Sequence, residues 1–220
     1  SESSCPFIKY TPISLTEQEP LKKACLFITS LIKEEGTLVL NKLASSKVIE
    51  NFILTASSAS SGAQTTETFC VVPNAELKSR IRGLAENEGK ISYEGRMSDS
   101  WIRELGPLGT NWMKEFIDIA PWLIIVMKKA YGFDENGEKL NYYCVNERVR
   151  IGMNLITAIH NTGLVTLTHT PSPINFLTEA LNRSANKRPY LLMPMGYTDK
   201  NDLGPDLKRK DLSEVVAYYE

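Results

Sequence analysis

A run of small polar residues between positions 55 and 69 is the part of the sequence best suited to bind a flat ligand. Ser60, Ser61, Gly62, Ala63 and Gln64 lie at its centre, and Ser, Thr, Ala and Gly make up most of the run. Short side chains let the backbone approach a ligand closely and present N–H and hydroxyl groups to it. Composition by itself favours a solvated loop, so a binding role depends on the rest of the chain.

Other reactive groups in the sequence are few. Cys70 with His160 or His169 could form a nucleophile and base, but no neighbouring residues are typical of a thiol hydrolase, which favours a buried thiol. Cys25 and Cys70 both fall on apolar faces, as free core thiols do. The chain has 2 His and 4 widely spaced Cys, and this predicts no metal site. It also contains no phosphate-binding glycine loop.

Periodic apolar residues predict the elements that position the polar run. Val48, Ile49, Phe52 and Ala56 repeat at helical spacing before it, and a strand follows at 69–72. Helical patterns also lie at about 16–33, after Asn74, at 112–117, at 145–159 and after Ser172, whose Pro173 we expect at the helix start. Buried strands are predicted at 122–128, 164–168 and 190–195. The expected fold is therefore a single α+β domain over residues 1–220, with helices layered on one sheet.

Two connecting segments have distinct compositions. Residues 86–109 are polar with several glycines and a proline, which predicts a long irregular segment and suggests a lid over a site. Residues 134–137, Asp-Glu-Asn-Gly, have the composition of a tight turn.

Charge and hydropathy exclude several classes of partner. The chain carries 25 Lys and Arg against 26 Asp and Glu, so there is no cationic excess to attract nucleic acid. No apolar run reaches the length of a membrane span and no signal peptide is visible, although a trimmed start would hide one. We expect a soluble protein, either cytoplasmic or the soluble portion of an anchored or secreted one.

Several motifs, spread from about Pro6 to the C-terminus, together resemble one family. They are the Ser-Gly-Ala turn, Tyr93, residues 110–115, Ala120-Pro121, residues 163–166, residues 168–171 and Asp-Leu-Lys-Arg-Lys at 206–210. The chain resembles the iodotyrosine deiodinase branch of the flavin mononucleotide (FMN)-dependent nitroreductase superfamily. This resemblance implies a nitroreductase-like α/β/α sandwich, an intertwined homodimer, a lid at about 86–112 and a C-terminal arm, about 204–220, that crosses onto the partner subunit.

The resemblance also implies roles for individual residues. The turn at 60–64 would lie along the flavin ring and ribityl chain, Thr168 and Thr170 would contact the pyrimidine edge and reactive nitrogen, and Arg209 would bind the phosphate. Tyr93 and Lys114 would grip the substrate, and Thr170 would tune the flavin. Tyr93, Lys114 and Thr170 are therefore the expected catalytic residues.

The sequence departs from the family pattern at three places. In the turn, Gln64 replaces the family's His, and the following Glu-Pro-Trp is shortened to Thr66-Glu67. Where the family has Arg-Arg-Ser-x-Arg for the phosphate, this chain has Lys33 to Leu38, with Glu34 and Glu35. A phosphate carries about 1.5 to 2 negative charges, and three lost charge-assisted contacts would cost on the order of 4 to 9 kcal/mol. In addition, Gly89 replaces the family's substrate-binding Glu, which leaves the substrate ammonium without its carboxylate unless Glu86 or Glu88 takes that place.

These departures leave three functions open, and whether the protein is an enzyme is open with them. The first hypothesis is a deiodinase-like homodimer with weakened FMN binding, whose pocket holds a small aromatic or phenolic ligand. The alternative is an active FMN-dependent oxidoreductase that dehalogenates halotyrosines or reduces nitro compounds or quinones. The third is a non-catalytic scaffold or regulatory subunit, for which the pocket should be closed.

Overall fold

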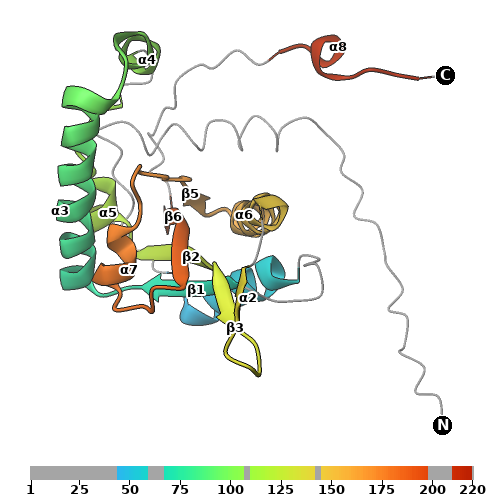
Figure 1. Ribbon diagram of the computed structural model, residues 1–220. Helices are drawn as coiled ribbons and strands as arrows, with labels where there is room; N and C mark the ends of the chain where they lie inside the picture. The colour runs from blue at the N-terminus through green and yellow to red at the C-terminus, as the bar shows by residue number, and fades with distance from the viewer. Residues whose placement is uncertain (1–43, 59–66, 107–109, 142–144, 198–209, 220) are drawn as a thin grey trace.

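The computed structural model describes residues 44–58, 67–106, 110–141, 145–197 and 210–219. Their elements are, in order, α2 (Ser46–Ser57), β1 (Glu67–Val72), α3 (Ala75–Ile91), the π-helical turn η1 (Ser92–Arg96), α4 (Asp99–Leu105), α5 (Phe116–Ile119), β2 (Trp122–Lys129), β3 (Tyr131–Phe133), β4 (Lys139–Asn141), α6 (Val145–Asn161), β5 (Val165–Thr166), α7 (Phe176–Ala180), β6 (Lys187–Gly196) and α8 (Leu212–Val215). Figure 1 shows their arrangement.

The centre of the described fold is a four-stranded antiparallel sheet in the order β1-β2-β6-β5. Strand β2 is buried from Leu123 to Met127 because helices cover both of its faces. This explains why its sequence is an uninterrupted apolar run and does not alternate with polar residues.

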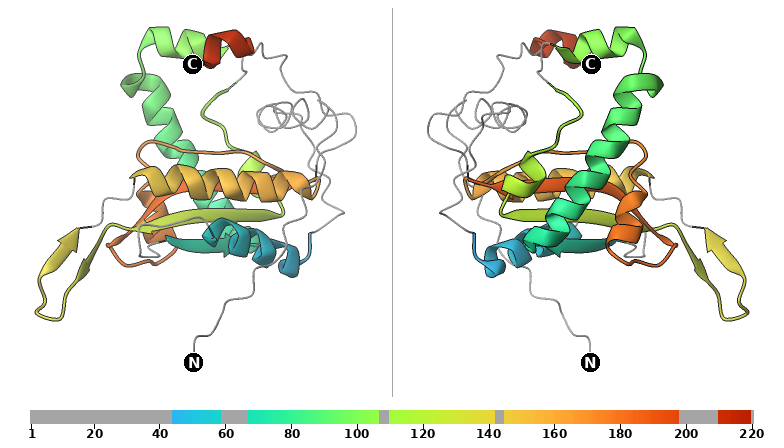
Figure 2. Two further views of the ribbon diagram at one scale, coloured as in Figure 1. Left: turned by 90° about the vertical axis from the view of Figure 1, so that its right-hand side faces the viewer. Right: turned by 90° about the vertical axis from the view of Figure 1, so that its left-hand side faces the viewer.

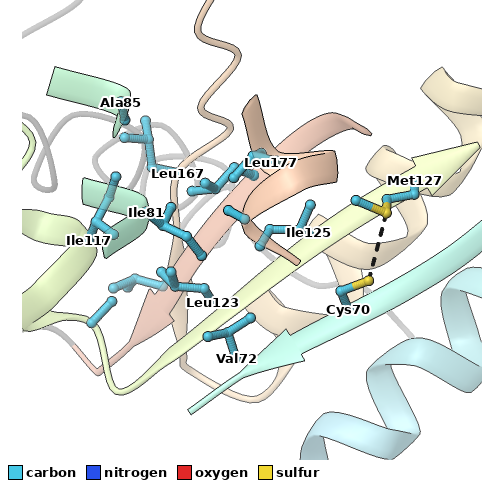
Figure 3. Close-up of a cluster of buried hydrophobic side chains, with 14 residues drawn as sticks. Cys70, Val72, Ile81, Ala85, Ile117, Leu123, Ile125, Met127, Leu167 and Leu177 are labelled. Atoms are coloured by element: carbon cyan, nitrogen blue, oxygen red, sulfur yellow. Dashed lines mark hydrogen bonds between the residues drawn. The ribbon is translucent and has the colours of Figure 1, made fainter. Parts of the chain in front are cut away.

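Helices pack on both faces of this sheet and form three layers (Figures 1 and 2). On one face, α3, α5 and α7 enclose a core that includes Cys70, Ile81, Ile125 and Leu177 (Figure 3). On the other face, α2 and α6 enclose a second apolar core. The predicted α+β fold with an α/β/α arrangement is confirmed for the described residues.

Helix α3 is longer than the sequence pattern suggested. Asn74 caps it by accepting the Leu77 N–H at 2.8 Å. The helix then continues to Ile91, and η1 and α4 follow, so the irregular segment predicted at 86–109 is wrong: most of it is helical. The polar residues there lie on an exposed helix. Such a helix lacks an apolar repeat, and its glycines wrongly suggested a loop.

Helix α3 is joined to the start of β2 by a buried lysine. Lys78 donates from Nζ to the carbonyl oxygens of Asp118 at 3.3 Å and Ala120 at 2.7 Å. Burial lowers the pKa of Lys78, and the nearby Asp118 carboxylate offsets part of this. The ammonium thereby satisfies carbonyls at the C-terminal end of α5 that have no helical partner.

A hairpin formed by β3 and β4 projects from the body of the molecule (Figures 1 and 2). Its turn confirms the prediction for residues 134–137. Asp134 Oδ1 accepts the N–H groups of Asn136 at 2.9 Å and Glu138 at 2.7 Å. Gly137 has a φ of 81°, a conformation that favours glycine.

Two predicted boundaries are wrong. Helix α7 begins at Phe176 after Asn175, so Ser172 does not cap it. The strand predicted at 164–168 is only Val165–Thr166, followed by an isolated bridge between His169 and Leu192. The helix expected at 16–33 lies outside the described residues, as does the start of the predicted C-terminal arm.

Candidate functional site

A cavity of about 350 Å³ lies beside the second half of α3. Its other walls come from η1, α4, the segment before α5 and the segment after β5. The lining residues are Ala85, Glu88, Gly89, Ser92, Tyr93, Arg96, Met97, Trp101, Leu105, Lys114, His169, Thr170, Pro171 and Ser172. Segments distant in the sequence therefore meet at one site.

The three predicted catalytic residues all line this cavity. Tyr93 comes from η1, Lys114 from the segment before α5, and Thr170 from the segment after β5. The Tyr93 hydroxyl lies 3.3 Å from the Thr110 hydroxyl. The geometry brings these residues together, and their roles remain a proposal.

Lys114 is held in place through its backbone. Its N–H donates to Glu86 Oε1 at 2.8 Å, and the same oxygen accepts the Arg82 Nε–H at 2.8 Å. Burial acts to raise the pKa of Glu86, but these two donors outweigh it and lower the pKa. Arg82 also donates to Asp118 at 2.9 Å, so the segment carrying Lys114 is tied to α3 and α5.

The Lys114 ammonium lies in a partly buried position. Its Nζ donates to the Asn111 carbonyl oxygen. Burial lowers the pKa of Lys114, and the Glu86 carboxylate partly opposes this change. A desolvated cation beside a cavity interacts strongly with any anion that enters.

His169 contributes a neutral imidazole to the lining. Its backbone exchanges hydrogen bonds with Leu192 at 2.8 and 3.0 Å, and its ring meets Phe116 edge-on at 5.5 Å. Burial, with a smaller effect from the Lys114 ammonium, lowers the pKa of His169 to about 3. Its Nε2 is buried and has no hydrogen-bond partner within the described part of the chain.

Arg96 and Ser92 connect η1 to the segment after β5. Arg96 Nη1 donates to Glu88 at 2.8 Å and to the Ser172 carbonyl oxygen at 3.5 Å. The Ser92 hydroxyl donates to the same carbonyl oxygen at 3.2 Å. These contacts join the cavity wall formed by α3 and η1 to the wall formed by the segment after β5.

Gly89 lies where α3 passes close to Trp112. A Cβ atom added there would be 3.3 Å from the Trp112 carbonyl oxygen and 3.4 Å from its Cβ. The close approach of the two backbones therefore favours a residue without a side chain.

The pairing of Cys70 with His169 as nucleophile and base is excluded by the sheet. Cys70 pairs with Ile125, Ile125 with Leu192, and Leu192 with His169. Three strand spacings of about 4.8 Å separate them by about 14 Å. Cys70 is instead a core thiol, as the sequence indicated, with its Sγ 3.8 Å from Met127 Sδ (Figure 3).

The predicted flavin-binding residues are only partly described. Thr168 and Thr170 have exposed side chains at the sheet edge. Ser60, Ser61, Gly62, Ala63, Gln64 and Arg209 lie outside the described residues, as do Lys33 to Leu38.

Sequence reasoning missed Arg96 and Trp101 as lining residues, and it named Glu88 only as a replacement for the carboxylate that is absent at Gly89. It considered His169 only as a partner for Cys70. The sequence does carry one relevant pattern, the Glu-x₇-Arg spacing of Glu88 and Arg96. This spacing predicts an ion pair only if a π-helical turn is known to follow the helix.

No family model matches the chain, but individual relatives match over nearly its whole length. The iodotyrosine deiodinase of Haliscomenobacter hydrossis is 43% identical over 216 residues, covering 97% of each chain. The chain belongs to the iodotyrosine deiodinase family. Other members of this family, from Danio rerio and Homo sapiens, are each 37% identical and cover 98% and 99% of the chain and 75% and 76% of their own lengths.

Solved structures share the deiodinase fold. A crystal structure of oxidised iodotyrosine deiodinase bound to FMN and 3-iodo-L-tyrosine has a TM-score of 0.73 at 21% identity, covering 91% of this chain and 98% of its own. A nitroreductase with bound FMN from Desulfitobacterium hafniense has a TM-score of 0.62 at 15% identity, covering 93% and 100%. Among the described residues of this deiodinase homologue, no helix combines the length and apolar character needed to cross a membrane.

Proposed function

We propose that the chain is an FMN-dependent oxidoreductase that removes halogen from a halogenated phenol of the tyrosine type. The observation that carries this proposal is the convergence of Tyr93, Lys114 and Thr170 on one cavity. The relatives named as iodotyrosine deiodinases support it, as does the FMN bound in a solved structure of the same fold.

The described residues fit a flavin beside this cavity. Thr168 and Thr170 offer exposed hydroxyl groups, and His169 has a buried Nε2 without a partner among the described residues. Thr168 and Thr170 would hold the polar edge of the flavin ring, with the turn at 60–64 and Arg209 completing the site. When bound, FMN supplies two electrons, which the replacement of an aryl carbon–iodine bond by carbon–hydrogen consumes together with one proton, releasing iodide.

The chain's own residues would orient the phenol and exclude water. The partly buried Lys114 ammonium attracts an anionic group of the substrate. Burial removes water that would otherwise screen this attraction. Tyr93, already within hydrogen-bond distance of Thr110, would close over the ring. The neutral His169 can donate or accept one hydrogen bond without adding charge.

Single-turnover kinetics tests the proposal. The FMN-loaded protein, reduced anaerobically with dithionite, should release iodide together with tyrosine from 3-iodotyrosine, or together with the parent phenol from an iodophenol analogue. Lys114→Met should lower kcat/KM by about 10- to 100-fold, because a hydrogen bond to a charged group is worth about 1.5–3 kcal/mol. The exposed Lys47→Met serves as the control. Absence of deiodination by the flavin-loaded protein would reject the proposal.

A second proposal is that the cavity still binds a ligand but that FMN binds only weakly. It rests on Glu34 and Glu35, which stand where the resemblance places phosphate-binding arginines. In this case the cavity binds a small aromatic molecule without turnover. Titration of FMN into the apoprotein separates the two proposals: a dissociation constant in the micromolar range or weaker, with no deiodination, supports the second, and tight stoichiometric binding supports the first.

The homodimer belongs to the proposal as well. A deiodinase homologue is expected to complete its flavin site with a partner subunit and with the C-terminal arm at about 204–220. The open cavity of about 350 Å³ favours ligand binding over the scaffold role, for which a closed pocket was expected.

A further inference from the structure

The charges around the cavity are unbalanced. Its lining includes two cations, Arg96 and Lys114, and one carboxylate, Glu88. Glu88 already accepts Arg96 Nη1 at 2.8 Å. Glu86 lies outside the lining but contacts Lys114. Its carboxylate accepts the Lys114 N–H and the Arg82 Nε–H. Within the described residues, the carboxylate of the lining that an entering ammonium group meets is Glu88, whose charge Arg96 already compensates through Oε2.

Arg96 is placed to bind a second carboxylate in addition to Glu88. Its side chain is 47% exposed, against 23% for Glu88, and its described contacts use only Nη1. A guanidinium has five N–H donors in a fork that matches a carboxylate. An entering carboxylate can thus be bound by the remaining donors while the contact to Glu88 persists.

The remaining lining suits an aromatic ring. Met97, Leu105, Pro171 and the 54% exposed Trp101 provide apolar and aromatic surface. His169 adds a buried Nε2 without a partner in the described part of the chain.

The backbone leaves little room to add a carboxylate at the neighbouring helix position. Gly89 lines the cavity, and a Cβ there would already lie 3.3 Å from the Trp112 carbonyl oxygen. A longer acidic side chain would require α3 or the Trp112 segment to move. The shortage of anionic groups is therefore fixed by packing as well as by composition.

We propose that the cavity selects phenols carrying a carboxylate and no ammonium group, such as halogenated hydroxyphenyl alkanoates, and that Arg96 is the residue that determines this specificity. The inference rests on the proposed function for its phenol. It goes further by naming the charge of the substrate side chain, which separates arylalkanoates from amino acids and from amines.

Calorimetric titration of the purified full chain, with saturating FMN, tests the inference by binding alone. Three probes share one ring: 3-(4-hydroxy-3-iodophenyl)propionate, 3-iodotyrosine and 3-iodotyramine. The propionate should bind at least about tenfold more tightly than iodotyrosine, and iodotyramine should bind most weakly, because one charged contact is worth about 1.5–3 kcal/mol. Iodotyrosine binding as tightly as the propionate, or more tightly, would overturn the inference.

Variants locate the selectivity. Arg96→Gln should weaken propionate binding by about tenfold or more and leave iodotyramine unchanged, whereas Arg96→Lys should recover part of the loss. Glu88→Gln should strengthen propionate binding a few-fold, because it frees Arg96. The exposed Arg103→Gln on α4 is the matched control. Equal effects of Arg96→Gln on all three probes would show a structural role and refute the assignment.

The two proposals fail in different ways. If the propionate binds as expected and is never deiodinated, the proposed reaction is wrong and the charge selection stands. If iodotyrosine is both preferred and deiodinated, the reaction stands and the selection is wrong.

Discussion

His169 occupies an unusual position between two threonines with exposed side chains. Its own ring is partly buried against Phe116, and the Lys114 ammonium lies near enough to disfavour a second positive charge. Burial is the larger of these two effects on its pKa. The result is a histidine that remains neutral over the range in which histidines normally titrate.

This neutrality predicts a pH-dependent stability. The unfolded chain binds a proton at His169 near pH 6.5, but the folded chain does so only at about pH 3. Between these values the unfolded state holds more protons, so the free energy of unfolding falls as the pH falls, by up to about 1.4 kcal/mol per pH unit. Urea unfolding at pH 7 and pH 5, at one protein concentration, should show this loss. His169→Asn should remove this contribution to the pH dependence of the free energy of unfolding. If that free energy falls equally with pH in the variant and the wild-type protein, the prediction is contradicted.

At the scale of elements, the segment before α5 depends on α3 for its position. Glu86 accepts both the Lys114 N–H and the Arg82 guanidinium, each at 2.8 Å. A change at Glu86 therefore acts on the cavity through Lys114, and Glu86 is a positioning residue.

A graded series at Glu86 tests this coupling. Glu86→Ala should lower the free energy of unfolding by about 1–3 kcal/mol and weaken anion binding, because the partly buried Lys114 N–H loses its acceptor. Glu86→Gln should retain most of both properties, since its amide oxygen can still accept that N–H. The exposed Glu104→Ala on α4 is the control, and calorimetry with a hydroxyphenylpropionate is the measurement. A Gln variant as impaired as the Ala variant would argue against positioning through the Lys114 N–H.

The elements that the sequence predicted best are those whose periodicity reflects burial. Strand β2 buries a long apolar run, so its pattern survives in the sequence. Helix α6 was predicted, but the face expected to carry Val149 and Met153 is exposed, and Ile151 and Leu155 are buried instead. The second half of α3 was missed because it is largely exposed and includes Gly89, whose presence reflects the contact with Trp112 rather than a break. Resemblance supplied Tyr93, Lys114 and Thr170. The ion pair between Arg96 and Glu88 could not be predicted, because it depends on the geometry of η1.

At the scale of the whole molecule, some exposed apolar side chains support the proposed homodimer. Val149 and Met153 lie one turn apart on α6 and are 66% and 55% exposed, while Ile151 and Leu155 of the same helix are buried. Tyr218 and Tyr219, after α8, are 83% and 94% exposed. Such groups are typical of surfaces that another chain covers, in agreement with the proposed homodimer.

Native mass spectrometry tests this assembly. The purified protein should appear as a dimer that retains one FMN per subunit. Met153→Asp should shift the population toward monomer and reduce the retained flavin, because it places a charge in an apolar interface. Leu140→Asp, at a 45% exposed position on β4, is the matched control and should leave the dimer intact. A monomeric wild-type protein that binds FMN fully would be incompatible with a shared site.

The projecting β3–β4 hairpin offers a site for attaching a label. Its turn is closed by its own hydrogen bonds to Asp134, and it points away from the end of α3 that borders the cavity (Figures 1 and 2). A fluorophore or an epitope attached at Glu135 would therefore report on tumbling and assembly while leaving ligand chemistry undisturbed. The same protrusion provides a fixed landmark for orienting particles of a small protein in images.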